Sequence, residues 1–180
     1  MAKYFIAIVP TGNVFDEIEA LKKTISNKYN TKGTLLSPAH ITLHMPFEFD
    51  ENKEQKLIKY LSDFSFESCF DIELRNLDCF EPRVIFINVL KSDDLSVLQK
   101  RLTNQLKQNL QIFTQADDMR GFHPHITIAY RDLKKPVFYQ IWDEYQNKSF
   151  EKTFTCQSFW LLKKEDKYWQ LHHEFQFYSH

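Results

Sequence analysis

The sequence predicts an α+β fold of two pseudo-symmetric lobes, each a small, mostly antiparallel sheet with outer helices, and a groove between the lobes. Two observations carry this prediction. The order strand, helix, strand, helix, strand occurs twice, in blocks of about residues 1–80 and 81–180. No linker rich in Pro, Gly or Ser separates the blocks. We therefore expect residues 1–180 to form a single bilobal domain.

The first block begins with KYFIAIV, a continuous apolar run that is typical of a strand buried on both faces. From about Gly12 to Tyr29, apolar residues recur at helical spacing and predict a helix. The stretch PAHITLHM then predicts a strand. A short helix follows, marked by Leu57, Ile58 and Leu61, and the block ends in the extended stretch FESCFDIELRNLDCF.

The second block repeats this order. RVIFINVL predicts a doubly buried strand, and a helix begins at a cap formed by Ser92 or Asp93. The apolar stripe of that helix is Leu95, Leu98, Leu102, Leu106 and Leu110. The strand HITIAY comes next, and then a short helix with Phe138, Ile141, Trp142 and Tyr145 on one face. The rest reads as extended chain, in which KKEDK predicts a hairpin turn.

Composition limits the class of protein. With 43% hydrophobic and 16% aromatic residues, the chain is able to bury a sizeable core. No window approaches the roughly 18 consecutive apolar residues of a membrane span, and the start MAKYFIAIVPTG lacks a cleavage site. We therefore expect a cytoplasmic protein that does not bind membranes. Three widely spaced cysteines predict neither a disulfide framework nor a thiolate zinc site.

The net charge and the glycine content limit the classes of ligand that the chain is expected to bind. A formal net charge of −1 argues against binding along a nucleic-acid duplex, which needs a basic surface, but allows a small anion or one RNA end. Only three glycines occur, and none of them forms a phosphate-binding loop of the ATP or dinucleotide type. No cofactor is therefore expected.

The motif His-Ile-Thr occurs twice, at His40-Ile41-Thr42 and at His125-Ile126-Thr127. On a strand, residues i and i+2 face the same way, so each His and Thr point to one side and the aliphatic residues to the other. The same alternation would also place His44 on the polar side. If the pseudo-symmetry brings the two strands together, two imidazoles and two hydroxyls line the groove between the lobes.

These residue types suit acid–base chemistry at a phosphate. An imidazole with an ordinary pKa of about 6.5 supplies a neutral base or a protonated acid near neutral pH. The Thr42 and Thr127 hydroxyls would bind the non-bridging oxygens of a phosphate. The scheme needs no metal, and no carboxylate cluster stands near either motif. A duplicated strand that has kept no chemistry is the alternative interpretation.

The paired motif resembles the twin H-x-T/S-hydrophobic signature of the two-histidine (2H) phosphoesterase superfamily, and most closely its 2′-5′ RNA ligase or RNA 2′,3′-cyclic phosphodiesterase branch. CFEPRVIFINV resembles the strand between the family's motifs, and SFWLLKKEDKYWQL resembles its closing hairpin. The first motif departs from the ligase-like pattern after Leu43, where HMPFEF stands in place of a Phe-Leu-Gly turn.

The resemblance implies a catalytic groove between the lobes and metal-independent cleavage, or reversible formation, of a phosphodiester that involves a ribose 2′ oxygen. It implies His40 and His125 as the catalytic pair and Thr42 and Thr127 as phosphate-binding residues. By similarity His125 is favoured as the base and His40 as the acid. The implied partner is an RNA end or a small nucleotide with a cyclic phosphate, bound by a monomer.

Further candidate residues lie near the motifs. Arg131 is a candidate to bind the phosphate, because a strand that continues from Thr127 would keep it on the groove face. The other candidate substrate contacts are Arg83, which carries charge, His44, which lies on the predicted groove face, and the aromatic residues Phe47, Phe122 and Tyr130, which would stack a base.

Three alternatives stay open. A zinc hydrolase would use His40, His44, His123 and His125, although His123 is better explained as a brace of the turn before Pro124. A non-catalytic module would bind a nucleotide or an RNA end in the same groove. A cyclic phosphodiesterase that acts on a small nucleotide would use the same residues as an RNA enzyme.

Overall fold

The structure is a computed structural model that describes residues 1–66, 68–113 and 121–177. The strands are β1 (Ala2–Ile8), β2 (Ile41–Phe49), β3 (Phe70–Phe80), β4 (Val84–Val89), β5 (His125–Ala129), β6 (Glu151–Cys156), β7 (Ser158–Glu165) and β8 (Tyr168–Gln176). The helices are α1 (Gly12–Tyr29), α2 (Glu54–Ser62), α3 (Asp93–Leu110) and α4 (Lys135–Tyr145), with short 3₁₀ helices η1 (Gly33–Leu36) and η2 (Glu51–Lys53).

The predicted repeat of elements is confirmed. The chain runs β1-α1-β2-α2-β3 and then β4-α3-β5-α4-β6, and the β7–β8 hairpin completes it. The α1 helix has the predicted bounds. The side chain of Ser92 caps α3 by accepting a hydrogen bond from the Leu95 N–H at 3.2 Å. The predicted hairpin turn lies at Asp166 and Lys167.

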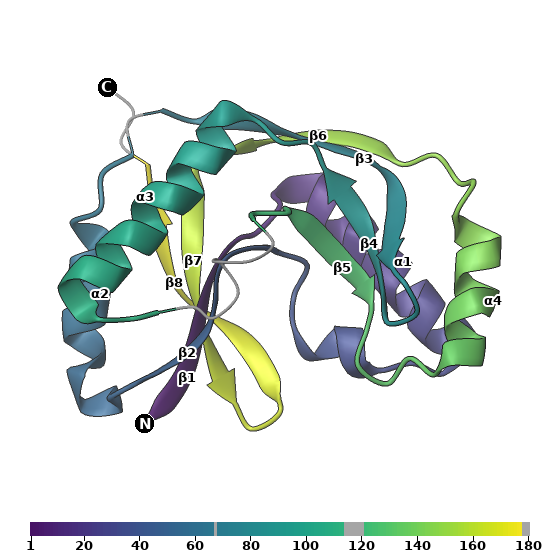
Figure 1. Ribbon diagram of the computed structural model, residues 1–180, viewed down its shortest axis with the longest axis horizontal. Coiled ribbons are helices and arrows are strands. Elements are labelled where there is room, and N and C mark those ends of the chain that lie inside the picture. The colour runs from purple at the N-terminus through teal and green to yellow at the C-terminus, as the bar shows by residue number, and fades with distance from the viewer. Residues whose placement is uncertain (67, 114–120, 178–180) are drawn as a thin grey trace.

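The strands form one curved sheet in the order β6-β3-β4-β5-β2-β1-β7-β8, and all neighbours are antiparallel. Of the strands in the described residues, four lie on each side of the junction between β2 and β5, where Ile41 pairs with Ile126. Figure 1 shows the two halves as lobes that face each other across this junction. The α+β prediction with two mostly antiparallel lobes is confirmed.

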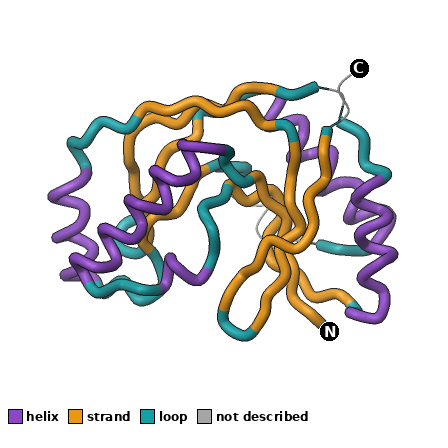
Figure 2. Tube along the Cα trace, turned by 180° about the vertical axis from the view of Figure 1, so that it is seen from behind, coloured by secondary structure: helices purple, strands orange, loops and turns teal. Residues whose placement is uncertain are grey.

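Each lobe draws on both sequence blocks. The lobe made of β2, β1, β7 and β8 takes its last two strands from the second block, and α3 of that block packs against β2. In the other direction, α1 of the first block crosses to β5, β6 and α4. Figures 1 and 2 show α2 and α3 outside one lobe and α1 and α4 outside the other.

The buried faces follow the predicted periodicity, but α1 and α3 also bury polar residues. Residues Tyr4–Ile8 of β1 are all buried, as expected for a strand covered on both sides. In α1 the buried face contains Ile18 and Ile25, but also Lys22, whose exposed fraction is only 1%. Lysine is almost never buried without a charged partner. None of the helices in the described part of the chain has the length and apolar character needed to cross a membrane.

The predicted alternation along β2 fails after Leu43. The pairing of β1 with β2 shifts register there: Ala7 pairs with Thr42, but Ile6 pairs with His44. This bulge turns His44 into the core, where it is 1% exposed and packs edge-on against Phe47 at 5.2 Å between ring centroids. Met45 faces outward instead and is 45% exposed.

Candidate active site

The junction of the lobes brings the two His-Ile-Thr motifs together. Since Ile41 pairs with Ile126 in antiparallel strands, the same register sets His40 across from Thr127 and Thr42 across from His125. The four polar side chains line one cavity of about 380 Å³. The paired isoleucines therefore mark the pseudo-two-fold axis of the site.

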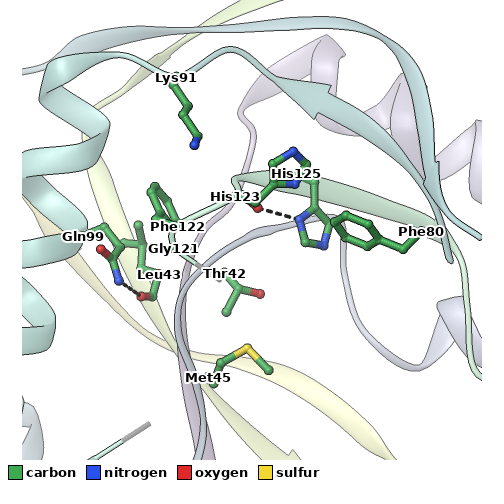
Figure 3. A pocket seen from close by; sticks show the side chains of 10 residues that line it. All are labelled: Thr42, Leu43, Met45, Phe80, Lys91, Gln99, Gly121, Phe122, His123 and His125. Carbon is green, nitrogen blue, oxygen red and sulfur yellow. Dashed lines mark hydrogen bonds between the residues drawn. The ribbon is translucent and has the colours of Figure 1, made fainter. Parts of the chain in front are cut away.

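Both imidazoles are held in the same way. His40 donates its Nδ1–H to the carbonyl oxygen of Pro38 at 2.7 Å, and His125 donates its Nδ1–H to that of His123, also at 2.7 Å. Figure 3 shows the second of these bonds. With Nδ1 as the donor, a neutral imidazole carries its lone pair on Nε2. Each ring thus keeps Nε2 as the nitrogen that exchanges protons.

A buried phenylalanine supports each imidazole. Phe5 of β1 lies 4.8 Å from His40 between ring centroids, and Phe86 of β4 lies 4.9 Å from His125. Both phenylalanines are almost fully buried. In addition, Trp169 meets Phe5 edge-on behind His40, and Phe80 meets the His125 imidazole itself edge-on. The symmetry of the site extends to its hydrophobic support.

Sequence reasoning missed these supporting residues, although a signal was present. The two buried strands share the pattern Phe-Ile-x-aliphatic, at Phe5–Ile8 and Phe86–Val89. Comparing the strands position by position would have paired Phe5 with Phe86. No pattern in the sequence marks the contribution of Met45, because its exposure depends on the bulge in β2.

Burial weakens the basicity of both imidazoles. It lowers the pKa of His40 to about 4, and the charge of Lys22, with that of His125 whenever this ring is protonated, acts in the same direction, against the hydrogen bond to Pro38. Burial also lowers the pKa of His125, against the hydrogen bond to His123. Both rings are therefore neutral near pH 7 in the free protein, and an arriving phosphate, being negative, favours their protonation.

The structure places the remaining candidates in four different environments: the catalytic cavity, an adjoining cavity, the core and an exposed turn. Arg131 and Tyr130 line the same cavity as the four motif residues. The strand does not carry Arg131 there as predicted: β5 ends at Ala129, and Arg131 reaches the cavity from the following turn with φ of 73°. Phe122 lines an adjoining cavity.

Three expectations are corrected. His44 and Phe47 lie in the core, 1% and 8% exposed, because the bulge in β2 turns this part of the strand inward. Arg83 lies on the exposed turn between β3 and β4, where its N–H donates to the Phe80 carbonyl, and it lines neither cavity.

The histidine set of a zinc hydrolase does not assemble. His44 is in the core, so the four histidines proposed as ligands do not face one cavity. In the described ranges, no group of three or more His, Cys, Asp or Glu side chains is placed to hold a metal ion. Among the residues that line the catalytic cavity, the two motif imidazoles, the two motif hydroxyls and the Arg131 guanidinium form a set that binds and protonates an anion.

Comparison with known proteins identifies the family. The model of the 2′-5′ RNA ligase superfamily matches residues 10–167. The chain belongs to this superfamily. A relative from Oceanobacillus iheyensis, named as a phosphoesterase, is 30% identical over 167 residues, 91% of each chain. The RNA 2′,3′-cyclic phosphodiesterase of Archaeoglobus fulgidus is 25% identical over 152 residues, 82% of this chain and 83% of the relative.

Solved structures agree on the fold. E. coli LigT in complex with 3′-AMP superimposes with a TM-score of 0.70 at 18% identity and 98% coverage of both chains. A protein from Thermus thermophilus gives a TM-score of 0.69 at 19% identity and 97% coverage of both chains. The resemblance inferred from the twin motifs is confirmed, and the protein is a phosphoesterase of the two-histidine class.

Proposed function

We propose that the protein is a metal-independent phosphodiesterase that acts on a ribose 2′,3′-cyclic phosphate or a 2′-5′ phosphodiester, at an RNA end or in a nucleotide. One observation carries the proposal: two imidazoles related by the pseudo-two-fold axis, each fixed through Nδ1, share a cavity with two threonine hydroxyls. The relative from Archaeoglobus fulgidus, an RNA 2′,3′-cyclic phosphodiesterase by name, supports the chemistry. LigT crystal structures that hold 3′-AMP, NADP⁺ or ATP support a ligand of nucleotide type.

In hydrolysis, a neutral imidazole takes a proton from water through Nε2 while the water oxygen bonds to phosphorus. The bond from phosphorus to the ribose oxygen breaks, and the second imidazole, protonated at Nε2, gives its proton to that oxygen. Thr42 and Thr127 donate hydrogen bonds to the non-bridging oxygens, and Arg131 adds a positive charge. With a ribose 5′-hydroxyl in place of water, the same attack on the cyclic phosphate forms a 2′-5′ phosphodiester, and the P–O bond to the 3′ oxygen breaks, so the same groups perform 2′-5′ ligation.

We assign His40 as the base and His125 as the acid, the reverse of the order favoured by similarity. The base must be neutral and the acid protonated when the substrate is bound. Burial lowers the pKa of both rings, but that of His40 falls as far as about 4, so His40 stays neutral over the whole physiological range and His125 is the ring more readily protonated. On the acid side, the rate should fall only as the pH approaches the pKa of His40. In a plot of rate against pH, the residual activity of His40→Ala should no longer fall on the acid side, whereas that of His125→Ala should no longer fall on the alkaline side.

The decisive experiment measures turnover of 2′,3′-cyclic nucleotides, oligonucleotides ending in a cyclic phosphate, and 2′-5′-linked dinucleotides. His40→Ala and His125→Ala should each lower turnover on the order of a hundredfold to ten-thousandfold while the fold survives. Full activity in either variant would refute the paired-histidine mechanism.

Two further outcomes would replace the proposal. EDTA should leave turnover unchanged; if EDTA abolishes it and zinc or manganese restores it, the histidines act as metal ligands. Tight binding of these probes without turnover of any of them would identify a non-catalytic nucleotide-binding module instead.

A further inference from the structure

A second cavity adjoins the catalytic one. It has a volume of about 480 Å³ and shares Thr42, Met45 and His125 with the catalytic cavity of about 380 Å³. The two cavities therefore meet at groups that would hold the reacting phosphate. Arg131 and Trp169 belong to the catalytic side, whereas the second cavity extends toward α3 and the end of β3.

The second cavity carries a cation and two phenylalanine rings in addition to the imidazoles of His123 and His125. Figure 3 shows the Lys91 side chain extending into it, with Phe122 and Phe80 on its walls. Phe80 is 45% exposed, although it also packs against His125 and Phe86. Gln99 is buried in the wall and donates from Nε2 to the Leu43 carbonyl at 3.4 Å. Aromatic faces beside a lysine suit a base and a phosphate of a single-stranded nucleic acid.

The size of the two cavities bears on the substrate. Ligand sites commonly measure about 300 to 1,000 Å³, so the catalytic cavity by itself is large enough for one nucleoside with its phosphate. A cyclic mononucleotide has no group left for the second cavity. A chain of two or more nucleotides has one, because a further base and phosphate extend from the reacting ribose.

We propose, on the basis of the function above, that the second cavity binds the nucleotide that precedes the reacting one in the chain. Lys91 would contact the phosphate that links the two nucleotides, and Phe80 and Phe122 would contact the base of the preceding nucleotide. The preferred substrate is accordingly the end of an RNA of at least two nucleotides.

The test compares kcat/KM for 2′,3′-cyclic AMP with that for the dinucleotide ApA ending in a 2′,3′-cyclic phosphate. Stacking of one additional base should favour the dinucleotide by about tenfold or more. Lys91→Met should lower kcat/KM for the dinucleotide and leave that for cyclic AMP unchanged. Lys100→Met, which removes an exposed lysine from α3, is the matched control and should change neither.

Equal kcat/KM for the two probes, or an equal loss of both in Lys91→Met, would overturn the subsite while leaving the proposed function intact. If neither probe turns over, the proposed function fails, and binding of the dinucleotide to wild type and to Lys91→Met then decides the subsite. Affinity that does not change in Lys91→Met would overturn it.

A different observation concerns the buried lysine of α1. Lys22 Nζ lies 2.7 Å from Glu19 Oε1 and donates to the Ser37 carbonyl, also at 2.7 Å. The same carboxylate oxygen accepts the Ala39 N–H at 2.7 Å. Between these two anchors, the Pro38 carbonyl accepts the Nδ1–H of His40. The ion pair thus clamps the segment that orients one catalytic imidazole.

Stability alone does not explain this pair. Burial lowers the pKa of Lys22 against the pull of Glu19, so the ammonium loses hydration that the pair only partly offsets. Apolar residues of similar size often replace such pairs at no loss of stability. The segment before His125 has no such clamp, unlike the segment before His40: among the described residues, no ion pair involves 121–124.

We propose that Glu19 and Lys22 are positioning residues for His40, which hold residues 37–39 so that the Pro38 carbonyl fixes Nδ1 and Nε2 faces the substrate. This too rests on the proposed function. The titratable and charged groups that face His40 are Lys22 and Glu19 from α1, His125 from β5 and Arg131 from the turn after β5.

Two substitutions separate positioning from general support. The charge of Lys22 lowers the pKa of His40 and that of Glu19 raises it. Lys22→Met should therefore raise the pKa of His40, and Glu19→Gln, whose amide oxygen still accepts from Ala39, should lower it. The acid limb of the pH profile should move in opposite directions in the two variants, while the alkaline limb stays in place.

Lys22→Met should also lower kcat on the order of tenfold to a hundredfold with little change in KM, because misplacing His40 affects the reaction more than binding. Lys23→Met, which removes the exposed neighbour of Lys22, is the matched control and should keep full activity. Should Lys22→Met fail to fold, Glu19→Gln alone carries the test.

Titration of the His40 imidazole by NMR gives a readout that needs no turnover. Shifts in the same direction, or no shift in either variant, would overturn the positioning role. The proposed function is tested separately by His40→Ala, so the two failures remain distinguishable.

Discussion

At the scale of single residues, the site consists of two imidazoles that the protein keeps neutral. Each ring packs at a tilt against a buried phenylalanine and has a carbonyl on Nδ1, so Nε2 is left to exchange protons. Phosphate provides the negative charge that this environment lacks. Protonation and substrate binding are therefore coupled at His40 and His125.

This environment predicts a dependence of stability on pH. The pKa of His40 is about 4 in the folded protein against 6.5 for the free imidazole, so the unfolded chain binds more protons between these values. Folding stability should then fall as the pH drops from about 6.5 to 4. His40→Asn should remove up to about 3 kcal/mol of this loss. Urea unfolding of the wild type and of His40→Asn at pH 7.5 and pH 4.5 measures the loss of stability in each protein. Equal losses in the two proteins would contradict the prediction.

The threonine hydroxyls should matter less than the histidines. If each supplies one hydrogen bond to the phosphate in the transition state, Thr42→Ala and Thr127→Ala should each raise the barrier by on the order of 2 to 3 kcal/mol. The serine variants, which keep the hydroxyl, serve as controls and should retain most of kcat. Equal losses in serine and alanine variants would show that the methyl group, rather than the hydroxyl, is needed.

At the scale of elements, one close approach holds Arg131 at the cavity. Gly33 of η1 lies so near the turn after β5 that a Cβ there would be 2.5 Å from the Tyr130 carbonyl oxygen and 2.8 Å from Arg131 Cβ. The Asp132 carboxylate closes the same contact by accepting from the N–H groups of Lys32 and Gly33. The path of this turn, and with it the position of Arg131, therefore depends on glycine at 33.

Gly33→Ala should accordingly push the turn outward. We expect a loss of about 1 to 3 kcal/mol in stability, together with a fall in kcat/KM as Arg131 leaves the phosphate. Lys32→Ala keeps its backbone bond to Asp132 and is the control. Urea unfolding and steady-state kinetics check both effects. Unchanged stability and kcat/KM in Gly33→Ala would mean that the turn after β5 moves to accommodate the methyl group without a loss of free energy.

The bulge in β2 makes a second prediction at this scale. His44 belongs to the core, so His44→Ala should keep turnover and lose on the order of 1 to 3 kcal/mol of stability. His40→Ala, in contrast, should lose turnover and keep its stability near neutral pH. Comparing the two variants by denaturant unfolding and by kcat separates the roles of residues that a regular strand would place on one face. Lost turnover in a folded His44→Ala protein would contradict the structure described.

At the scale of the whole molecule, the lobes are interleaved. The α1 helix of the first block packs on β5, and β7 of the second block pairs with β1. We propose that residues 1–180 act as one folding unit for this reason. A fragment of residues 1–80 would leave Phe5 without Trp169 and β3 without β4 and β6.

The fragment of residues 1–80 should therefore show no cooperative thermal transition by circular dichroism, whereas the full chain should show a single one. The fragment of residues 81–180 is the complementary test and should behave in the same way. A cooperative transition in either fragment would mean that a sequence block is a domain in its own right.

The sequence by itself determined whatever depends on neighbours along the chain. The twin motifs, the side to which His40 and Thr42 point, the span of α1 and the cap of α3 all follow from local periodicity, which holds whatever the element packs against. The polar pair and the aliphatic pair of each motif were therefore predictable. So was the family.

Tertiary structure alone decided the rest. Whether His44 or Met45 faces the groove depends on a register shift against β1, and the pairing of one strand with another is not encoded in the period of either. The partnership of Lys22 with the segment before His40 arises because α1 passes beside that segment after an intervening turn. Long-range packing sets these contacts. The polar groups that surround a lysine within an apolar helix face are brought to it only by the folding of the rest of the chain, so the helix sequence does not specify them.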